Sequence, residues 1–279
     1  MTNIIRADVY RIVRGKGLYI TLAIFLAIII LQIVGGTNVN AGVNINLDID
    51  IFEIIDIENF NVNEFSFADF LHSPTGVEAP FQVMEGSANI MYILLPLIIF
   101  IGAADFSSGA AKNTLSGGIS RKKYYCAKLI LSCVCCALLL LAYVVLSTLM
   151  ATAINGFGGA FNGEYVLRVL RIFLPQLLLC LSIVCVGNFF VFTFQKSAAV
   201  NGLYIAFLLV PSVIIFTLSF ISARFERLFD YELTMNIGAL VQIDSMSAGD
   251  IARIAIVGTA YIIVAVVCGF VIFRRTEIK

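Results

Sequence analysis

Few residues of this chain have the type and spacing needed for catalysis or metal binding. His72 is the single histidine, so the chain cannot contain a His-Glu-x-x-His zinc motif. A serine hydrolase, which needs a Ser–His pair, would have only this one histidine to use. The seven cysteines lie in or beside apolar stretches, without the carboxylate or histidine neighbours and regular gaps of a zinc site. Cysteines of a disulfide framework would lie in exposed loops. We therefore predict no metal site and no disulfide scaffold.

Carboxylates and phosphate-binding loops give no stronger indication of an enzyme. An aspartyl site needs two carboxylates close together, and Asp105, at the edge of an apolar stretch, has no second carboxylate beside it in the sequence. The Gly-x-x-x-x-Gly-Lys-Ser/Thr loop that holds nucleotide phosphates is not found in the sequence. We expect no catalytic residues and no cofactor in this chain. An intramembrane enzyme is the least favoured alternative.

The composition indicates that lipid surrounds most of the chain. Of its 279 residues, 60% are hydrophobic and only 13% are charged, and the mean hydropathy is +0.99. Soluble domains contain roughly 45–50% apolar and about 25% charged residues. The formal net charge is zero, which gives no basic face for nucleic acid.

Six apolar stretches are long enough to cross a bilayer, which takes about 20 residues per helix. They are residues 18–34, 88–104, 129–155, 172–194, 197–223 and 254–273. No small-residue cleavage site is obvious after the first stretch, so we interpret it as a retained helix and not as a signal peptide. The predicted fold class is an all-α polytopic membrane protein, with residues 1–279 forming one transmembrane domain.

The distribution of charge predicts that both termini are cytoplasmic (N-in/C-in). With this orientation, thirteen of the eighteen Lys and Arg residues lie inside and fifteen of the eighteen acidic residues lie outside. Membrane proteins place Lys and Arg near the cytoplasmic ends of their helices. The predicted outer segments include residues 35–87, between the first two helices, and residues 224–253.

The outer segment 35–87 is acidic and contains no Lys or Arg. Apolar and polar residues alternate over 43–51, which predicts an exposed strand, and the apolar spacing over 65–71 predicts a short helix on the membrane surface. We expect a small external cap. Its carboxylates could attract a cationic cargo or could only keep the segment outside and soluble. The candidates for attraction are Asp48, Asp50, Glu53, Asp56 and Glu58.

Two cytoplasmic segments could transmit movement. In residues 1–16, Ile5, Val9, Ile12 and Val13 fall on one stripe of a helix, which predicts an amphipathic helix on the inner membrane face; a solvated tail is the alternative. Residues 105–128 contain a short helix-forming stretch, a Gly-Gly break and then Ser120, which is placed to cap the next helix. A short helix on a glycine hinge could couple a soluble motor to the membrane, although the composition also fits a plain loop.

The segment 105–128 resembles the cytoplasmic loop of ABC-2 type transporter permeases, in particular the bacitracin- and lantibiotic-immunity group. The resemblance is specific only over this segment, and the rest of the chain matches in layout. Ala111 departs from the pattern, because Thr is more usual there. The residues that carry the resemblance are Asp105, Gly109, Ala111, Lys112, Gly118, Ile119, Ser120, Arg121, Tyr125 and Lys128.

This resemblance implies the membrane-spanning permease subunit of an ATP-driven exporter in a bacterial cytoplasmic membrane. It implies separate ABC ATPase subunits that bind ATP and Mg²⁺, a second permease chain that is identical or paralogous, and an amphiphilic peptide or lipid-like substrate. Residues 1–16 would be the elbow helix and 105–128 the coupling loop. The coupling residues that we expect are Asp105, Gly109, Lys112, Leu115, Gly118, Ser120, Arg121 and Lys122.

An ion-coupled transporter or channel subunit is the alternative from another class. Such proteins place ionisable groups within the bilayer. The predicted spans contain neutral polar residues instead, among them Gln176, Asn188 and Asn201, which commonly form hydrogen bonds between helices.

Overall fold

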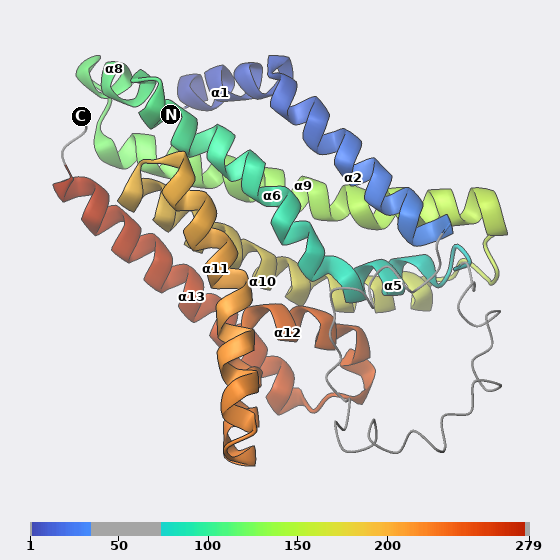
Figure 1. Ribbon diagram of the computed structural model, residues 1–279. Helices are drawn as coiled ribbons and strands as arrows, with labels where there is room; N and C mark the ends of the chain where they lie inside the picture. Colours follow the sequence, from blue (N-terminus) through green and yellow to red (C-terminus); the bar gives the residue numbers. More distant parts are fainter. Residues whose placement is uncertain (1, 35–73, 277–279) are drawn as a thin grey trace, which may run out of the picture.

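The computed structural model describes residues 2–34 and 74–276, which form helices joined by short connections, with no strand among them. Figure 1 shows these helices packed into an elongated bundle, with both ends of the described chain at the same end of the molecule, next to α8. The elements are α1 (Thr2–Arg14), α2 (Lys16–Val34), α5 (Ala79–Glu85), η3 (Gly86–Asn89), α6 (Ile90–Ile98), η4 (Ile99–Ala103), α7 (Ala104–Ser107), α8 (Ala110–Ser116), α9 (Arg121–Asn155), α10 (Gly163–Phe194), α11 (Ser197–Ser219), η5 (Ala223–Tyr231), α12 (Leu233–Ala239), η6 (Leu240–Ser245) and α13 (Ala248–Arg275).

Within the described residues, five helices are long and apolar enough to cross a membrane: the continuous α6–α7 unit, α9, α10, α11 and α13. A sixth crossing results only if α1 and α2 count as one span, and these two helices are bent by 63° at their junction. The multi-pass helical character predicted from the sequence is therefore confirmed. The number six and the N-in/C-in orientation stay predictions.

Polar caps explain why several helices extend beyond the predicted apolar stretches. The helices α9, α10 and α13 begin at residues 121, 163 and 248, whereas their apolar stretches begin at 129, 172 and 254. In each case the residue before the helix accepts a hydrogen bond from a backbone N–H in the first turn: Ser120 from Lys123 at 3.4 Å, Asn162 from Tyr165 at 2.9 Å and Ser247 from Asp250 at 3.2 Å. Hydropathy locates the lipid-facing part of a helix, but these caps set where it begins.

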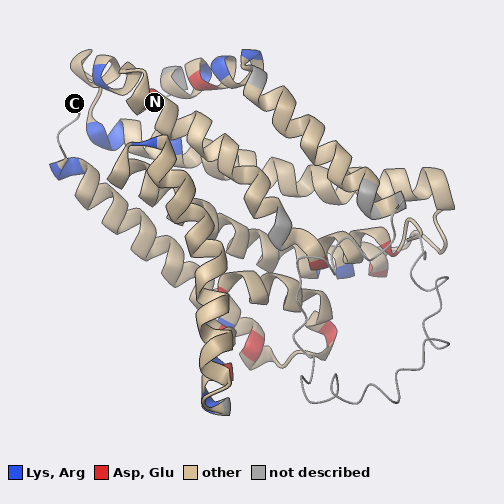
Figure 2. Cartoon of the chain, in the orientation of Figure 1, with Lys and Arg blue, Asp and Glu red and all other residues tan. Residues whose placement is uncertain are grey.

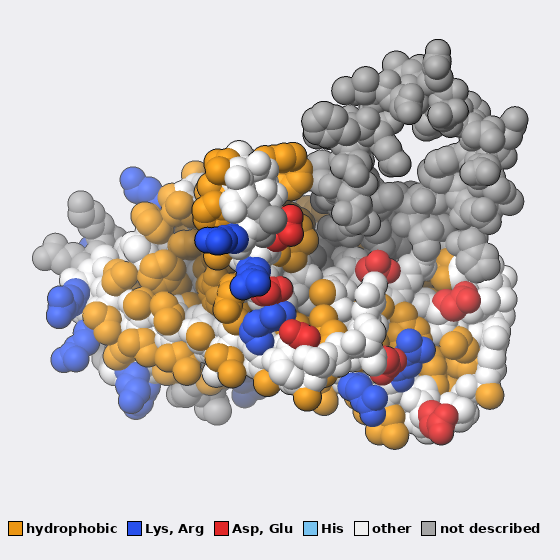
Figure 3. Space-filling model, turned by 90° about the horizontal axis from the view of Figure 1, so that it is seen from below, with side chains coloured by type: hydrophobic (Ala, Val, Ile, Leu, Met, Phe, Trp, Pro, Cys, Tyr) orange, Lys and Arg blue, Asp and Glu red, His pale blue; other side chains and the backbone are white. Residues whose placement is uncertain are grey.

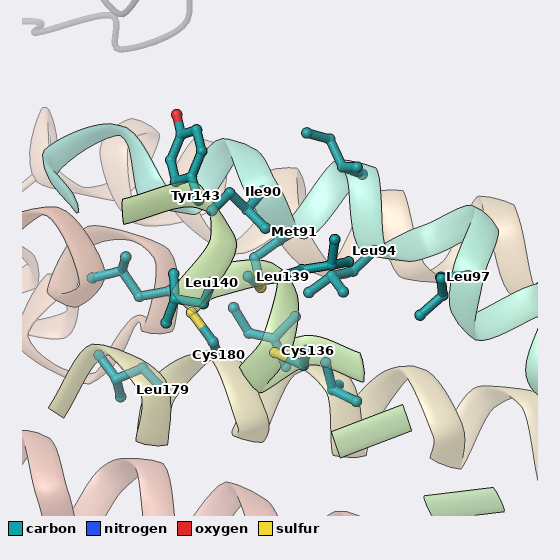
Figure 4. Close-up of a cluster of buried hydrophobic side chains, with 14 of the residues drawn as sticks. Ile90, Met91, Leu94, Leu97, Cys136, Leu139, Leu140, Tyr143, Leu179 and Cys180 are labelled. Carbon is teal, nitrogen blue, oxygen red and sulfur yellow. The ribbon is translucent and has the colours of Figure 1, made fainter. Parts of the chain in front are cut away.

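The core is formed where α6, α9 and α10 meet (Figure 4). Figure 4 shows Met91 and Leu94 of α6 beside Leu140 and Cys136 of α9, with Cys180 of α10 next to them. On its other side α10 lies along α13, where the Ser182 hydroxyl donates to the Gly258 carbonyl at 2.9 Å. A Cβ at Gly258 would stand 3.1 Å from the Leu179 side chain, so this close helix contact favours glycine.

The predicted outer loop 224–253 is folded, forming η5, α12 and η6. The buried Gln176 side chain of α10 holds it in place, because its Nε2 donates to Met84 and Ile237 carbonyls, both at 2.8 Å. These bonds join α5 and α12 to α10. The strand predicted at 43–51, the surface helix predicted at 65–71 and the carboxylates Asp48, Asp50, Glu53, Asp56 and Glu58 lie outside the described residues.

Charges are distributed unevenly along the bundle. Figure 2 shows Lys and Arg concentrated at the end that carries α8, the start of α9 and the end of α13, whereas most acidic residues of the described chain lie toward the other end. This is the asymmetry that the sequence predicts for a cytoplasmic and an outer face.

Candidate functional site at the charged helix junction

Four charged side chains and one tyrosine join three helices at the basic end of the bundle. We call this group the charged junction; it consists of Asp8 and Arg11 of α1, Asp105 of α7, and Tyr124 and Lys128 of α9. The Lys128 ammonium forms ion pairs with both carboxylates, at 2.8 Å from Asp8 Oδ1. Arg11 also bridges the two, pairing with Asp105 and lying 3.2 Å from Asp8. The Tyr124 hydroxyl donates to Asp105 Oδ2 at 2.9 Å.

A local break in helical geometry precedes Asp105. The span that begins with α6 passes through a π-helical turn, η4, before α7, and such turns alter the backbone hydrogen bonding. The Arg11 guanidinium lies against this turn, with Nη2 donating to the Phe100 carbonyl at 3.4 Å and the guanidinium carbon 5.6 Å from the Phe100 ring centre. A Cβ at Gly15 would stand 2.7 Å from the same ring, so the α1–α2 bend needs a small residue here.

Burial makes the charged junction an electrostatic unit. Lys128 is 1% exposed, Asp105 4% and Asp8 6%. Two negative and two positive side chains balance, which is the condition under which buried charges are tolerated. Burial raises the pKa of the Asp8 carboxyl in α1, although the hydrogen bond from Lys128 acts in the opposite direction. Asp8 Oδ2 has no hydrogen-bond partner in the described structure.

The charged junction corrects one interpretation made from the sequence. Asp105 does have a neighbouring carboxylate, Asp8, since Lys128 bridges the two. The buried Lys128 lies in α9, one residue before the apolar stretch 129–155, which is itself free of charge. The N-terminal helix forms as predicted. Ile12 of the predicted stripe is buried together with Asp8, whereas Val9 and Val13 are exposed on the protein surface, so contact of this stripe with the membrane stays a prediction. The sequence feature that could have indicated this buried ion pair is Asp8 itself, an acidic residue one helical turn before Ile12 in an otherwise basic segment.

The short helix α8 is held between two glycines in the left-handed region. Gly109 before it has φ 71°, and Gly118 after it has φ 89°, a conformation in which glycine carries no steric cost. The short helix predicted in this segment and the break at Gly117 and Gly118 are therefore present. Ala111 is fully buried and Leu115 packs beside it, whereas Lys112 is exposed.

Behind α8 lies an aromatic cluster, which sequence reasoning missed. We define it as Phe106, Tyr124, Tyr125, Phe192 and Phe273, which come from α7, α9, α10 and α13. The ring centres of Tyr125 and Phe192 are 4.6 Å apart, and those of Phe192 and Phe273 are 4.8 Å apart. Ala111 and Leu115 of α8 pack against this cluster. Through this cluster, α8 is in contact with three of the long helices, α9, α10 and α13.

Arg121 has a structural role that differs from the predicted one. Its Nη1 donates to the carbonyls of Phe273 at 2.9 Å, Arg274 at 3.0 Å and Thr276 at 2.7 Å. These are carbonyls at the end of α13, which have no partner inside the helix. Arg121 thus fastens the end of α13 to the start of α9, and its predicted contact with a soluble partner stays a prediction.

The structure divides the eight predicted coupling residues into three groups. Asp105 is buried in the charged junction and Arg121 is bound to α13. Gly109 and Leu115 are partly buried around α8. The exposed ones, available to another protein, are Lys112, Gly118, Ser120 and Lys122.

Replacing Arg121 with Gln is expected to loosen the end of α13. Hydrogen bonds from a charged donor contribute about 1.5–3 kcal/mol, so local opening of this end should rise about tenfold. The measurement is the rate of tryptic cleavage after Arg274 and Arg275, followed by mass spectrometry. Lys122→Gln, one position along on the exposed side, is the control; equal cleavage rates in the two variants would contradict the role assigned to Arg121.

Known proteins do not identify the site. The sequence matches no protein-family model and no curated protein. No group of three or more His, Cys, Asp or Glu side chains suited to a metal ion occurs within the described residues. The charged junction and the aromatic cluster together connect α1, α7, α8, α9, α10 and α13 at one end of the bundle.

Proposed function

We propose that the chain is the membrane-spanning permease subunit of an ATP-driven exporter, in which a separate ABC ATPase binds at α8. The observation that carries this proposal is the placement of α8. It is a short helix with an exposed lysine, Lys112, on one side and with Ala111 and Leu115 packed into the aromatic cluster on the other. Because α9, α10 and α13 all contribute to that cluster, force applied to α8 by a soluble protein would reach all three.

The position of α1 gives further support. The charged junction fastens this amphipathic helix to the end of α7 and the start of α9, at the same end as α8 (Figure 1). An elbow helix attached in this way would move with the two helices that flank α8. In this proposal the basic end faces the cytoplasm of a bacterial cell, and a second permease chain completes the translocation path.

The proposed cargo is an amphiphilic or antimicrobial peptide or a lipid-like molecule, moved out of the membrane or the cell. The acidic segment 35–87 could attract such a cargo if it is cationic. This part of the proposal rests on the sequence and on the resemblance over 105–128.

A pulldown tests the assignment. The full chain, extracted in mild detergent from the cells that express it naturally, is expected to bring down an ATPase with a phosphate-binding Gly-x-x-x-x-Gly-Lys-Ser/Thr loop. Amine-reactive cross-linking should then join that protein to Lys112 of α8. A purified chain that transports its cargo without an ATPase would contradict the proposal.

An ion-coupled transporter is the second candidate, and the charged junction is the observation that favours it. Ionisable groups buried in membrane proteins often relay ions or protons, and Asp8, Asp105 and Lys128 are all buried. Their mutual ion pairs at one end of the bundle fit a structural link better. The discriminating measurement is transport into proteoliposomes under an imposed proton gradient, with no nucleotide present.

A further inference from the structure

A cavity of about 190 Å³ lies between α11, the η5–α12 segment and α13, away from the charged junction and α8. Figure 3 looks onto the molecule from below and shows acidic and basic side chains among apolar ones on that face. The wall of the cavity is mostly apolar or aromatic, with one carboxylate. Its lining includes Phe207, Ile215, Leu228, Tyr231, Glu232 and Tyr261.

Glu232 is the unusual member of this wall. Only 6% of it is exposed, and no ion pair among the described residues includes it. The nearby arginine on α13, Arg253, is 3.2 Å from Asp230 and 3.2 Å from Asp250, so its charge is already balanced by other carboxylates. A carboxylate buried without a cation is costly.

The structural role of Glu232 does not account for its charge. Its carboxylate accepts hydrogen bonds from the Met235 backbone N–H at 2.6 Å and from the Thr234 hydroxyl, which caps the short helix α12. A cap requires an acceptor, and neutral Ser or Asn supplies one equally well. Both carboxylate oxygens are thus hydrogen-bonded, but no Lys or Arg among the described residues forms an ion pair with Glu232, which lies in the wall of the cavity.

We propose that this cavity binds the cationic group of an amphiphilic organic molecule, an ammonium attached to an apolar or aromatic body, with Glu232 as the counter-charge. Aromatic rings attract organic cations, and Phe207, Tyr231 and Tyr261 line the cavity, with Phe207 and Tyr261 packed edge-to-face at 6.3 Å between ring centres. The size fits a phenyl or short alkyl group, because an apolar cavity of about 150 Å³ in another protein holds benzene. This binding holds whether or not an ATPase drives the protein, so it does not rest on the proposed function.

The experiment compares a cation with a neutral molecule of the same shape. Phenethylammonium and 2-phenylethanol are titrated against the full chain in phosphatidylcholine nanodiscs, with saturation-transfer NMR as the readout and empty nanodiscs as the blank. The parent protein is expected to bind the ammonium at least about tenfold more tightly than the alcohol. Glu232→Gln keeps an oxygen acceptor for the cap and should abolish this preference.

Glu226→Gln is the matched control, since Glu226 is an exposed carboxylate in the neighbouring η5 segment; it should bind both probes as the parent does. Tyr261→Leu provides a second variant that leaves Glu232 in place, and it should weaken ammonium binding several-fold without affecting the alcohol. The inference is overturned if the parent binds both probes equally, or if the folded Glu232→Gln protein keeps its preference for the ammonium. Should Glu232→Gln fail to fold, unchanged ammonium binding by Tyr261→Leu overturns it.

Discussion

Replacing Lys128 with Met is expected to lower the free energy of unfolding by about 3–5 kcal/mol, the usual cost of removing one partner of a buried ion pair. Lys128 is 1% exposed and pairs with both Asp8 and Asp105. Without it, two carboxylates share the single arginine Arg11 inside the charged junction. The measurement is unfolding of the detergent-solubilised chain by heat or denaturant.

Lys123→Met is the matched control, because Lys123 is an exposed lysine on the same helix. It should change stability by less than about 1 kcal/mol. The double variant Asp8→Asn with Lys128→Met leaves Arg11 paired with Asp105 and restores a neutral junction. It should therefore be less destabilised than the sum of the two single changes. If Lys128→Met and Lys123→Met are equally stable, the charged junction does not hold these helices together.

The second large effect concerns α8 and rests on the proposed function. We expect Lys112 to meet an acidic surface of the ATPase, so that Lys112→Glu places like charges at the interface and weakens association at least about tenfold. Leu115→Pro should abolish transport, since proline removes a helical hydrogen bond and clashes with the preceding turn. The amount of folded chain in the membrane should be unchanged for Lys112→Glu. Co-purification and ATP-driven transport are the two readouts.

Lys196→Glu controls for charge reversal in general, because Lys196 is also exposed, at the residue that precedes α11. Leu115→Ala controls for the loss of packing, because it removes the side chain but keeps the α8 backbone. Both controls should retain the ATPase. Normal association and normal transport in both Lys112→Glu and Leu115→Pro would remove α8 from the coupling mechanism.

Local features determined the long apolar helices and the short helix α8, which could be predicted from the sequence, whereas α5, η5, α12 and η6 were not predicted. Apolar stretches of about 20 residues give the membrane-crossing parts, while Ser120 fixes where α9 begins and Gly109 and Gly118 set α8 apart. Each of these is a property of neighbouring residues, so it is visible in the chain as written. The asymmetric distribution of Lys and Arg is visible in the same way, and it predicts an orientation.

Only the packing of the helices determines which charged side chains form ion pairs. Arg11 and Asp105 are 94 positions apart and Lys128 and Asp8 are 120 apart, and nothing along the chain pairs them. In the sequence, Arg121 looks like an ordinary basic residue of a loop. Only the folded structure brings it beside the end of α13. In the sequence, Glu232 looks like an ordinary acidic residue of an outer loop, and only the packing of η5 and α12 beside α11 and α13 places it in the wall of a cavity. A charged side chain loses its contact with water when it is buried, so it needs an oppositely charged or hydrogen-bonding partner. Which side chains are buried together depends on how helices distant in the sequence pack, and a pattern of neighbouring residues cannot show this.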